Sequence, residues 1–169
     1  MPHLSITLTA AEVYNLDCEL TGGVNLISQS FITTGILKQK MSNVQKFWLN
    51  DLKLEIKPYK ENLDQTRNDL IGCLGEISQT GVPSIPYTVP KKDEQGNPVM
   101  DGDKPVMETN PNLLEYTRQL EEVLSQQITI QYHPFKLEDY TFDTEDSYPT
   151  FYKLIKHAME AAETAEVVN

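Results

Sequence analysis

The sequence predicts a mainly helical α+β protein: a long antiparallel helical hairpin with a small two-stranded antiparallel sheet and a short Pro/Gly-rich β-hairpin. Three observations predict this class. Apolar residues recur at helical spacing through residues 36–78. Two short segments, 4–8 and 128–132, alternate apolar and polar side chains as half-buried strands do. Between them, residues 79–109 are rich in proline, glycine and aspartate and follow neither period.

Length and composition indicate one folded domain. The chain has 169 residues, of which 39% are hydrophobic. It contains neither an apolar run long enough to span a bilayer nor a secretory leader, so we expect it to fold in a cytoplasm. Cys18 and Cys73 lie far apart and predict neither a disulfide nor a zinc site. We expect both to be small buried hydrophobic residues.

The charge of the chain is strongly negative. Its formal net charge is −11, from 14 basic and 25 acidic residues. Only Arg67 and Arg118 are arginines, whereas proteins that grip phosphates need a clustered cationic surface that is often rich in arginine. The composition therefore disfavours nucleic acid as a partner and favours other protein subunits.

The charges are also segregated along the chain. Residues 36–60 carry six lysines against two carboxylates, a net +4, while residues 138–169 carry eight carboxylates against two lysines, a net −6. Opposite charges favour docking of the two segments, within one chain or between copies. The alternative is that both are simply solvated faces. The candidate partner-binding residues are Lys46, Lys53, Lys57, Lys60, Glu138, Asp139, Asp143, Glu145 and Asp146.

Residues 1–35 predict a strand followed by a capped helix. Residues 4–8 form the strand, and Thr9 with Glu12 fits a capping box that starts a helix of about 11 residues. Gly22 and Gly23 end that helix. Its expected inner residues are Val13, Leu16 and Leu20. Residues 24–35 predict a loop or a short helix.

Residues 36–78 predict a long helix with one apolar stripe. Pro58 lacks an N–H and collides with the preceding turn, so two readings remain: two helices that meet at Pro58, or one rod kinked near it. The stripe keeps its phase across Pro58, which favours the rod. The remaining sides are then free to meet other molecules. The stripe comprises Leu37, Met41, Val44, Trp48, Leu52, Ile56, Tyr59, Leu63, Leu70, Leu74 and Ile77.

Residues 79–109 predict an extended connector and then a hairpin. The connector carries Pro83, Pro86 and Pro90. A weak repeat follows, in which residues 97–100 (NPVM) are echoed by residues 104–107 (KPVM) around the turn 101–103 (DGD). Turn residues between two short apolar pairs predict a small exposed β-hairpin.

Residues 110–169 predict a helix, a strand, an acidic segment and a last helix. Asn110 and Pro111 form a strong start for a helix that continues to about Gln127. The strand 128–132 should pair with residues 4–8. The acidic segment extends through Tyr148, and the last helix covers 149–162. Its expected inner residues are Phe151, Leu154, Ile155 and Ala158.

No catalytic signature is present. The three histidines are scattered and lack metal-ligand spacing, and neither a phosphate-binding glycine loop nor a nucleophile elbow occurs. Carboxylates of the segment 138–143 could serve acid–base chemistry, but an acidic docking strip with aromatic anchors is favoured. We therefore expect no enzyme, no metal and no cofactor.

The order of these segments along the chain resembles that of a known group of proteins. After the strand, the capped helix and the long Lys/Glu-rich helix, the chain contains residues 91–99 (KKDEQGNPV), 114–124 (LEYTRQLEEVL), 128–130 (ITI) and 135–140 (FKLEDY). Over residues 36–140 this pattern resembles small proteins of tailed bacteriophages and prophages that have no established activity. Pro58 and the Pro83–Pro90 connector depart from it. The resemblance implies a viral origin and a task in building or regulating a phage, and it assigns no functional residue.

Together these observations predict a phage structural or assembly protein that acts through protein–protein contacts. We expect a virion component such as a connector or ring subunit near the head–tail junction, bound to phage structural proteins or to copies of itself. The alternative is a phage-encoded acidic inhibitor or regulator of a host protein in the cytoplasm. An enzyme that uses the paired carboxylates is the third hypothesis.

Overall fold

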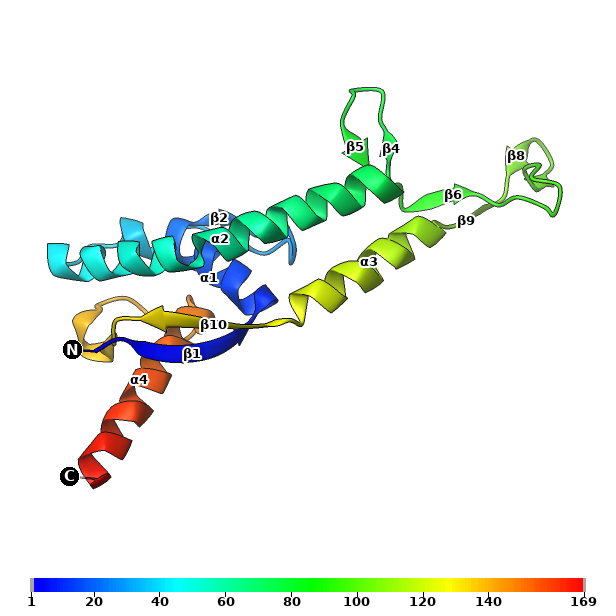
Figure 1. The fold of residues 1–169 in the computed structure, drawn as a ribbon. Helices are drawn as coiled ribbons and strands as arrows, with labels where there is room; N and C mark the ends of the chain where they lie inside the picture. The colour runs from blue at the N-terminus through cyan, green and yellow to red at the C-terminus, as the bar shows by residue number, and fades with distance from the viewer. Residues whose placement is uncertain (1, 169) are drawn as a thin grey trace. The chain divides into compact units, whose positions relative to one another are not determined.

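A computed structural model describes residues 2–168, and their side chains through Glu166 (Figure 1). This part of the chain is an α+β fold of α-helices and two-stranded antiparallel ladders, which confirms the α+β part of the prediction. No helix within residues 2–168 combines the length and the apolar character needed to cross a bilayer. The α-helices are α1 (Ala10–Thr21), α2 (Asn43–Leu74), α3 (Pro111–Leu124) and α4 (Pro149–Val168).

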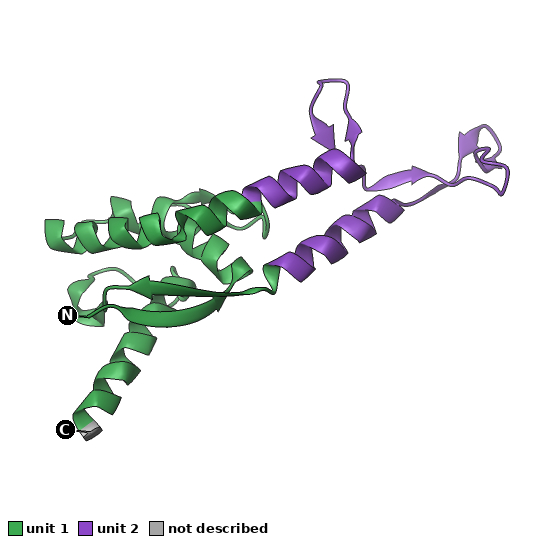
Figure 2. Ribbon diagram, viewed as in Figure 1, with its two compact units in different colours: residues 1–63, 124–169 green, residues 64–123 purple. Residues whose placement is uncertain are grey.

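The chain divides into two compact units (Figure 2). Unit 1 comprises Met1–Leu63 and Leu124–Asn169, and unit 2 comprises Asp64–Val123. Unit 1 is therefore built from both ends of the chain, and α2 begins in unit 1 and ends in unit 2.

The sheet of unit 1 pairs the two strands that the sequence predicts. Strands β1 (Leu4–Thr9) and β10 (Gln127–Tyr132) run antiparallel, with Leu4 opposite Tyr132. One face is buried and carries Ile6, Leu8, Ile130 and Tyr132. On the other face the hydroxyls of Thr7 and Thr129 lie 2.9 Å apart. The alternation in the sequence thus corresponds to one core face and one exposed face.

Helix α1 follows the predicted capping pattern. The Thr9 hydroxyl accepts the N–H of Glu12 at 3.2 Å, and the Glu12 carboxylate accepts the N–H of Thr9 at 3.1 Å. Gly22, with φ 79°, ends the helix. The predicted inner residues Val13, Leu16 and Leu20 are fully buried.

Most of residues 24–35 is loop, as expected, and no helix forms there, but the segment also contains part of a short hairpin that the sequence did not predict. Strands β2 (Gly23–Val24) and β3 (Phe31–Ile32) pair as a hairpin. The turn is stabilised by the Asn25 side chain, whose oxygen accepts the N–H groups of Ile27 and Ser28, both at 3.0 Å. A ladder of two residue pairs is too short to leave a periodic signal in the sequence.

Helix α2 runs unbroken through Pro58, so the two-helix reading is wrong. The helix begins at Asn43, later than the predicted 36, because Ser42 and Gln45 form a capping box with N–H to side-chain oxygen distances of 3.1 and 3.2 Å. Residues Ile36–Lys38 form the separate 3-10 turn η1. The helix ends at Leu74, before Gly75, whose backbone approaches Ser84 so closely that a Cβ would lie 2.7 Å from the Ser84 carbonyl oxygen.

The apolar stripe of α2 is partly displaced from the predicted one. Leu52, Ile56 and Leu63 are buried as expected, and Leu49 joins them. Val44 and Ile77 are exposed, at 68% and 77%. Val44 precedes the point where the helix meets the core, and Ile77 lies beyond its end. Cys18 is buried as expected, but Cys73, near the end of α2, is exposed.

The core of unit 1 is completed by α4. Phe151, Leu154, Ile155 and Ala158 are buried as predicted. They pack with side chains of β1, β10, α1 and α2 in one hydrophobic cluster. The helix continues to Val168, beyond the expected end at residue 162. The segment before α4 contains the 3-10 turn η2 (Leu137–Asp139).

Unit 2 consists of the end of α2, three short ladders and α3. Asn110 caps α3 as predicted, because its side-chain oxygen accepts the N–H of Asn112 at 3.0 Å. The turn at Gly102, with φ 62°, joins the two strands that carry the sequence repeat. The ladders pair β4 (Glu76–Ile77) with β5 (Pro83–Ser84), β6 (Thr88–Pro90) with β9 (Met107–Thr109), and β7 (Met100–Asp101) with β8 (Lys104–Pro105).

Candidate functional site

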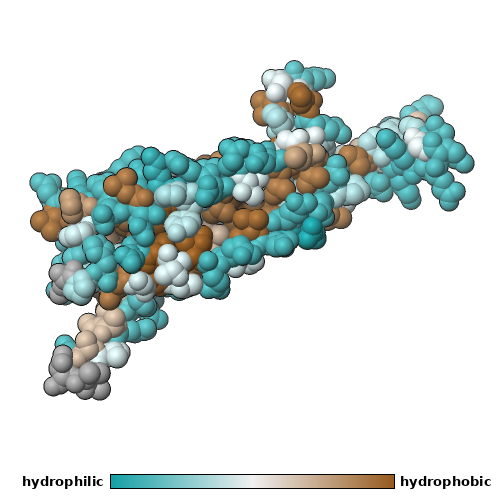
Figure 3. Space-filling view, in the orientation of Figure 1, coloured by the Kyte–Doolittle hydropathy of each residue, from teal (hydrophilic) through white to brown (hydrophobic). Residues whose placement is uncertain are grey.

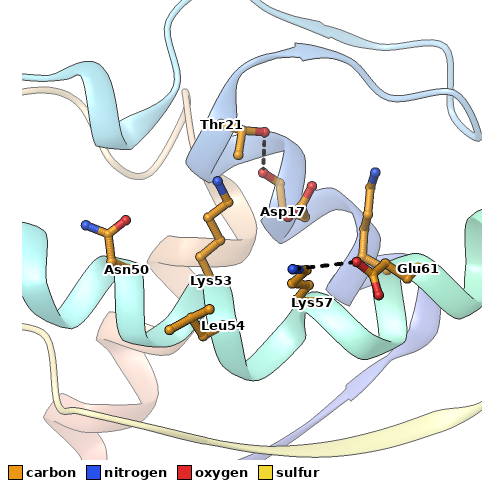
Figure 4. A pocket seen from close by; sticks show the side chains of 8 residues that line it. Asp17, Thr21, Asn50, Lys53, Leu54, Lys57 and Glu61 are labelled. Atoms are coloured by element: carbon orange, nitrogen blue, oxygen red, sulfur yellow. Dashed lines mark hydrogen bonds and ion pairs between the residues drawn. The ribbon is translucent and has the colours of Figure 1, made fainter.

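A groove of about 580 Å³ lies between α1 and α2 in unit 1 (Figure 4). Its lysines are spaced four and three residues apart on α2, so they share one side of that helix. The C-terminal half of α1 forms the other wall. The lining residues are Asp17, Thr21, Asn50, Lys53, Leu54, Lys57, Lys60 and Glu61. We call this feature the lysine groove.

The lysine groove is cationic and partly apolar. Lys57 lies 3.8 Å from Glu61, but both side chains are more than 60% exposed, so this ion pair is weak. The ammonium of Lys60 lies 5.8 Å from the ring centre of Tyr14. Lys53 is half-buried and forms no ion pair or hydrogen bond within the described part of the chain. Leu54 adds an apolar side chain that is 66% exposed.

The structure brings together three of the four predicted lysines. Lys53, Lys57 and Lys60 line the groove, whereas Lys46 lies further along the same helix outside its lining. Sequence spacing alone could place the lysines on one side of a helix. The position of α1 beside α2 depends on tertiary packing. Nothing in the local sequence therefore predicts that Asp17 and Thr21 line the other side of the groove.

The five predicted acidic residues lie together in another part of unit 1. Glu138, Asp139, Asp143, Glu145 and Asp146 are all exposed. The segment is attached to the first turn of α2, because the side-chain amide of Gln45 donates to the carbonyl oxygen of Asp139 at 3.0 Å. The carboxylate of Asp143 accepts the N–H of Asp146 at 3.2 Å.

The aromatic residues of this acidic segment point inward, which corrects the expectation of a docking strip with aromatic anchors. Tyr140 and Tyr148 are buried in the core of unit 1. The Tyr148 hydroxyl donates to the carbonyl oxygen of Thr34 at 2.5 Å. Burial, with the nearby charge of Asp139, raises the pKa of Tyr140. The carboxylates of the segment are therefore exposed to solvent, while Tyr140 and Tyr148 are part of the core of unit 1.

Unit 2 buries very few of its side chains. Among residues 64–123, all of which the structure describes, only Asn110 and Leu120 are buried. Figure 3 shows apolar side chains on the surface of the β4–β5 hairpin, in agreement with the high exposure of Ile77 and Val82. The large exposed apolar residues of unit 2 are Ile77, Val82, Tyr87, Met100, Met107 and Leu114.

A buried carboxylate that the sequence did not indicate lies between α1 and α4. Glu19 is fully buried and accepts the N–H groups of Thr150 and Phe151 at 3.1 and 2.8 Å, together with a hydrogen bond from Asn15. Burial raises the pKa of Glu19, and the hydrogen bonds from Phe151 and Thr150 oppose that shift. This carboxylate serves as the N-terminal cap of α4.

Two of the three histidines, His3 and His133, lie near each other, with ring centres 6.5 Å apart. The rings of Trp48 and His133 stack at 4.0 Å, and His3 lies 3.6 Å from Asp51. Burial lowers the pKa of His133. Trp48, expected in the core, is instead half-buried at its margin. No group of three or more His, Cys, Asp or Glu side chains among the described residues is placed to hold a metal ion.

The third histidine, His157, lies beside the core. Its Nδ1 is 2.6 Å from the hydroxyl of Tyr132, which also donates to the carbonyl oxygen of Leu154 at 3.1 Å. Burial raises the pKa of Tyr132 to about 12. A tyrosine held neutral and satisfied in this way ties β10 to α4 and has a structural role.

A second, smaller groove of about 230 Å³ lies beside α4. It is mostly apolar, and it includes Glu138 from the acidic segment. The lining residues are Pro134, Phe135, Lys136, Glu138, Ala158, Met159 and Ala162.

The chain matches no protein-family model, no curated protein and no solved structure.

Proposed function

We propose that this chain is a structural or assembly protein of a tailed phage, and that unit 2 docks onto another protein subunit. The observation that supports this proposal is the surface of unit 2, where a folded segment of 60 residues keeps almost no core of its own. Large apolar side chains on the surface of a segment with so little core of its own favour a role in binding another protein.

The energetics of the ladders support the same proposal. Each pairs only two or three residues of each strand, and an isolated two-stranded hairpin is at best marginally stable in water. A partner that covers Ile77, Tyr87 or Leu114 would stabilise the complex by about 1 kcal/mol or more for each side chain. The contact would then supply the burial that unit 2 lacks.

The resemblance to phage proteins makes the partner a phage subunit. In this proposal the end of α2 and α3 form the two arms of a helical hairpin that supports the ladders. The place of action is the virion, as a connector or ring component near the head–tail junction. Copies of the chain itself are the second kind of partner, and neither a membrane nor nucleic acid takes part.

The test compares two double variants of the phage gene. Ile77→Ser with Val82→Ser removes apolar surface from the β4–β5 hairpin, where both side chains are exposed and the fold does not depend on them. Leu26→Ser with Phe31→Ser makes a similar change on exposed residues of unit 1 and is the control. We expect mass spectrometry of purified particles to find the wild type and the control, and to find several-fold less of the unit 2 variant. Absence of the wild type from particles and assembly intermediates would overturn the proposal.

The alternative is an acidic inhibitor of a host protein, and the exposure of all five carboxylates in residues 138–146 favours it. It predicts that the chain is absent from particles and forms a salt-sensitive complex with one basic host protein. Glu145→Gln with Asp146→Asn should weaken that complex, whereas the unit 2 variant should leave it unchanged.

A further inference from the structure

The end of α4 leaves the core of unit 1. The first half of the helix buries Phe151, Leu154, Ile155 and Ala158, but no side chain from Met159 to Glu166 is buried. Figure 1 shows this end pointing away from the β1–β10 sheet. Only the side of this segment with Met159 and Ala162 borders the rest of unit 1, at the small groove, and a short helical segment with so little packing is only marginally stable in water. The projecting end is therefore suited to packing against another protein.

The projecting end of α4 is acidic. Glu160, Glu163 and Glu166 are all exposed and follow one another at intervals of three residues. At 1.5 Å per residue these carboxylates extend along about 9 Å of helix. The described part of α4 beyond Ala158 carries no basic residue, so this end presents a uniform negative charge.

The lysine groove is comparable to this end in length, and its three lysines outnumber its two carboxylates, Asp17 and Glu61. Lys53, Lys57 and Lys60 extend along about 10.5 Å of α2 at the same rise per residue. The half-buried Lys53 forms no ion pair in the described structure, although Asp17 and Glu61 line the same groove, so an incoming carboxylate can pair with it. Leu54 in the groove and the exposed Met159 of α4 offer a small apolar contact beside the charges.

The α4 of the same chain cannot fill this groove. Its first half is fixed in the core, and the Glu19 carboxylate holds its N-terminus at Thr150 and Phe151. Its far end points away from α2, which carries the lysines (Figure 1). An α4 that fills this groove must therefore come from another molecule.

We propose that the lysine groove of one copy binds the Glu160–Glu166 end of α4 from a second copy. This contact rests on the proposed function, in that it names a second copy as one of the assembly partners. The two surfaces differ, so the contact is head-to-tail, and repetition closes a ring or continues as a filament.

The test is a charge swap followed by sedimentation velocity at low and high salt. One variant combines Lys53→Glu with Lys57→Glu, and the other combines Glu163→Lys with Glu166→Lys. We expect the wild type to self-associate in low salt, and each variant alone to associate at least about tenfold more weakly. An equimolar mixture of the two variants should form complexes again, because each supplies the surface that the other has lost.

Matched controls separate this contact from a general effect of charge. Lys38→Glu with Lys40→Glu makes the same change on exposed lysines outside the groove, and Glu94→Lys with Glu108→Lys does so on exposed glutamates of unit 2. Both should associate like the wild type. Removal of residues 160–169 should abolish association while the helical circular dichroism signal falls only by the deleted part.

Three results would overturn the contact: a wild type that stays monomeric in low salt, charge variants that associate normally, or a mixture that does not recover. Its failure is distinguishable from failure of the proposed function. If the charge variants assemble normally while the Ile77/Val82 variant is missing from particles, only this contact is wrong. If the charge swap restores association but the chain is absent from particles and assembly intermediates, only the phage assignment is wrong.

Discussion

The carboxylate of Glu19 in α1 accepts the backbone N–H of Phe151 at 2.8 Å, so the first turn of α4 is capped by a residue 132 positions earlier. The same carboxylate accepts the N–H of Thr150. Helix caps are usually supplied by a neighbour in sequence. Here the cap comes from a different helix, and it fixes the position of α4 on α1.

We predict that Glu19→Ala destabilises unit 1 by about 2–3 kcal/mol, because the N–H groups of Thr150 and Phe151 are left buried without an acceptor. Urea unfolding followed by circular dichroism measures the change. Glu160→Ala, on the exposed end of α4, is the control and should change the free energy of unfolding by less than about 0.5 kcal/mol. Equal effects of the two substitutions would show that the cap contributes nothing.

The pH dependence of the Glu19 contribution has a definite sign. Burial raises its folded-state pKa above the ordinary value of 4.5, so the folded state takes up a proton more readily than the unfolded state. The part of the contribution that depends on proton uptake is therefore complete below pH 4.5 and is lost as the pH rises through the higher folded value, while the hydrogen bonds from Thr150 and Phe151 remain. Relative to Glu19→Gln, which cannot titrate, the wild type should become more stable as the pH falls toward 4.5. A difference that stays constant with pH would contradict this.

Glu12 should behave in the opposite way. Its burial acts to raise the pKa, but the ion pair with Lys153 at 2.7 Å and the hydrogen bonds with Thr9 hold it below 4.5. Its contribution is present above pH 4.5 and disappears as the pH falls through the lower folded value. Glu12→Gln should cost about 1 kcal/mol at pH 7, and the difference from wild type should vanish in acid. Unfolding curves at pH 7 and pH 3 test this.

The capping box of α2 provides a third test. Ser42→Ala removes the hydroxyl that accepts the Gln45 N–H at 3.2 Å and should cost about 1 kcal/mol. Ser5→Ala, on the exposed face of β1, is the matched change outside a helix start and should cost clearly less. Comparison of their urea midpoints decides whether Ser42 caps the helix.

Two glycines should respond in opposite directions to alanine. A Cβ at Gly35 would overlap the backbone of Thr21 and Leu20, so Gly35→Ala should destabilise unit 1 by about 3 kcal/mol. Gly72 lies inside α2 with nothing within 4 Å of a new Cβ, so Gly72→Ala should stabilise that helix by about 0.5–1 kcal/mol. Thermal unfolding of both variants measures the pair of effects. A Gly35→Ala variant as stable as the wild type would contradict the described approach of Gly35 to α1.

The parts of the fold that the sequence predicts are those with a local signal. The capping box of Thr9 and Glu12 and the start at Asn110 are encoded within a few residues of the elements that they begin. The pairing of residues 4–8 with 128–132 follows from two short alternating segments. The start of α2 was misplaced because the apolar period continues through Ile36, while the capping box of Ser42 and Gln45 interrupts the helix there.

Less of the candidate site than of the fold could be predicted from the sequence. The spacing of Lys53, Lys57 and Lys60 predicts a shared helix face, and the structure places all three in one groove. The orientation of Tyr140 could not be predicted, because an aromatic residue between carboxylates fits an exposed anchor as well as a core residue. In the structure the ring of Tyr140 is buried in the core of unit 1.

The pairing of β1 with β10 has a consequence for synthesis on the ribosome. Thr7 and Thr129 face each other across 122 positions, so the first strand leaves the exit tunnel long before its partner exists. The ladders β4–β5 and β7–β8 pair residues that are close in sequence. They can form before the partner of β1 has been synthesised. During that interval Ile6 and Leu8 lack the strand that pairs with β1 in the folded protein, so the sheet of unit 1 can form only after residues 127–132 have been synthesised.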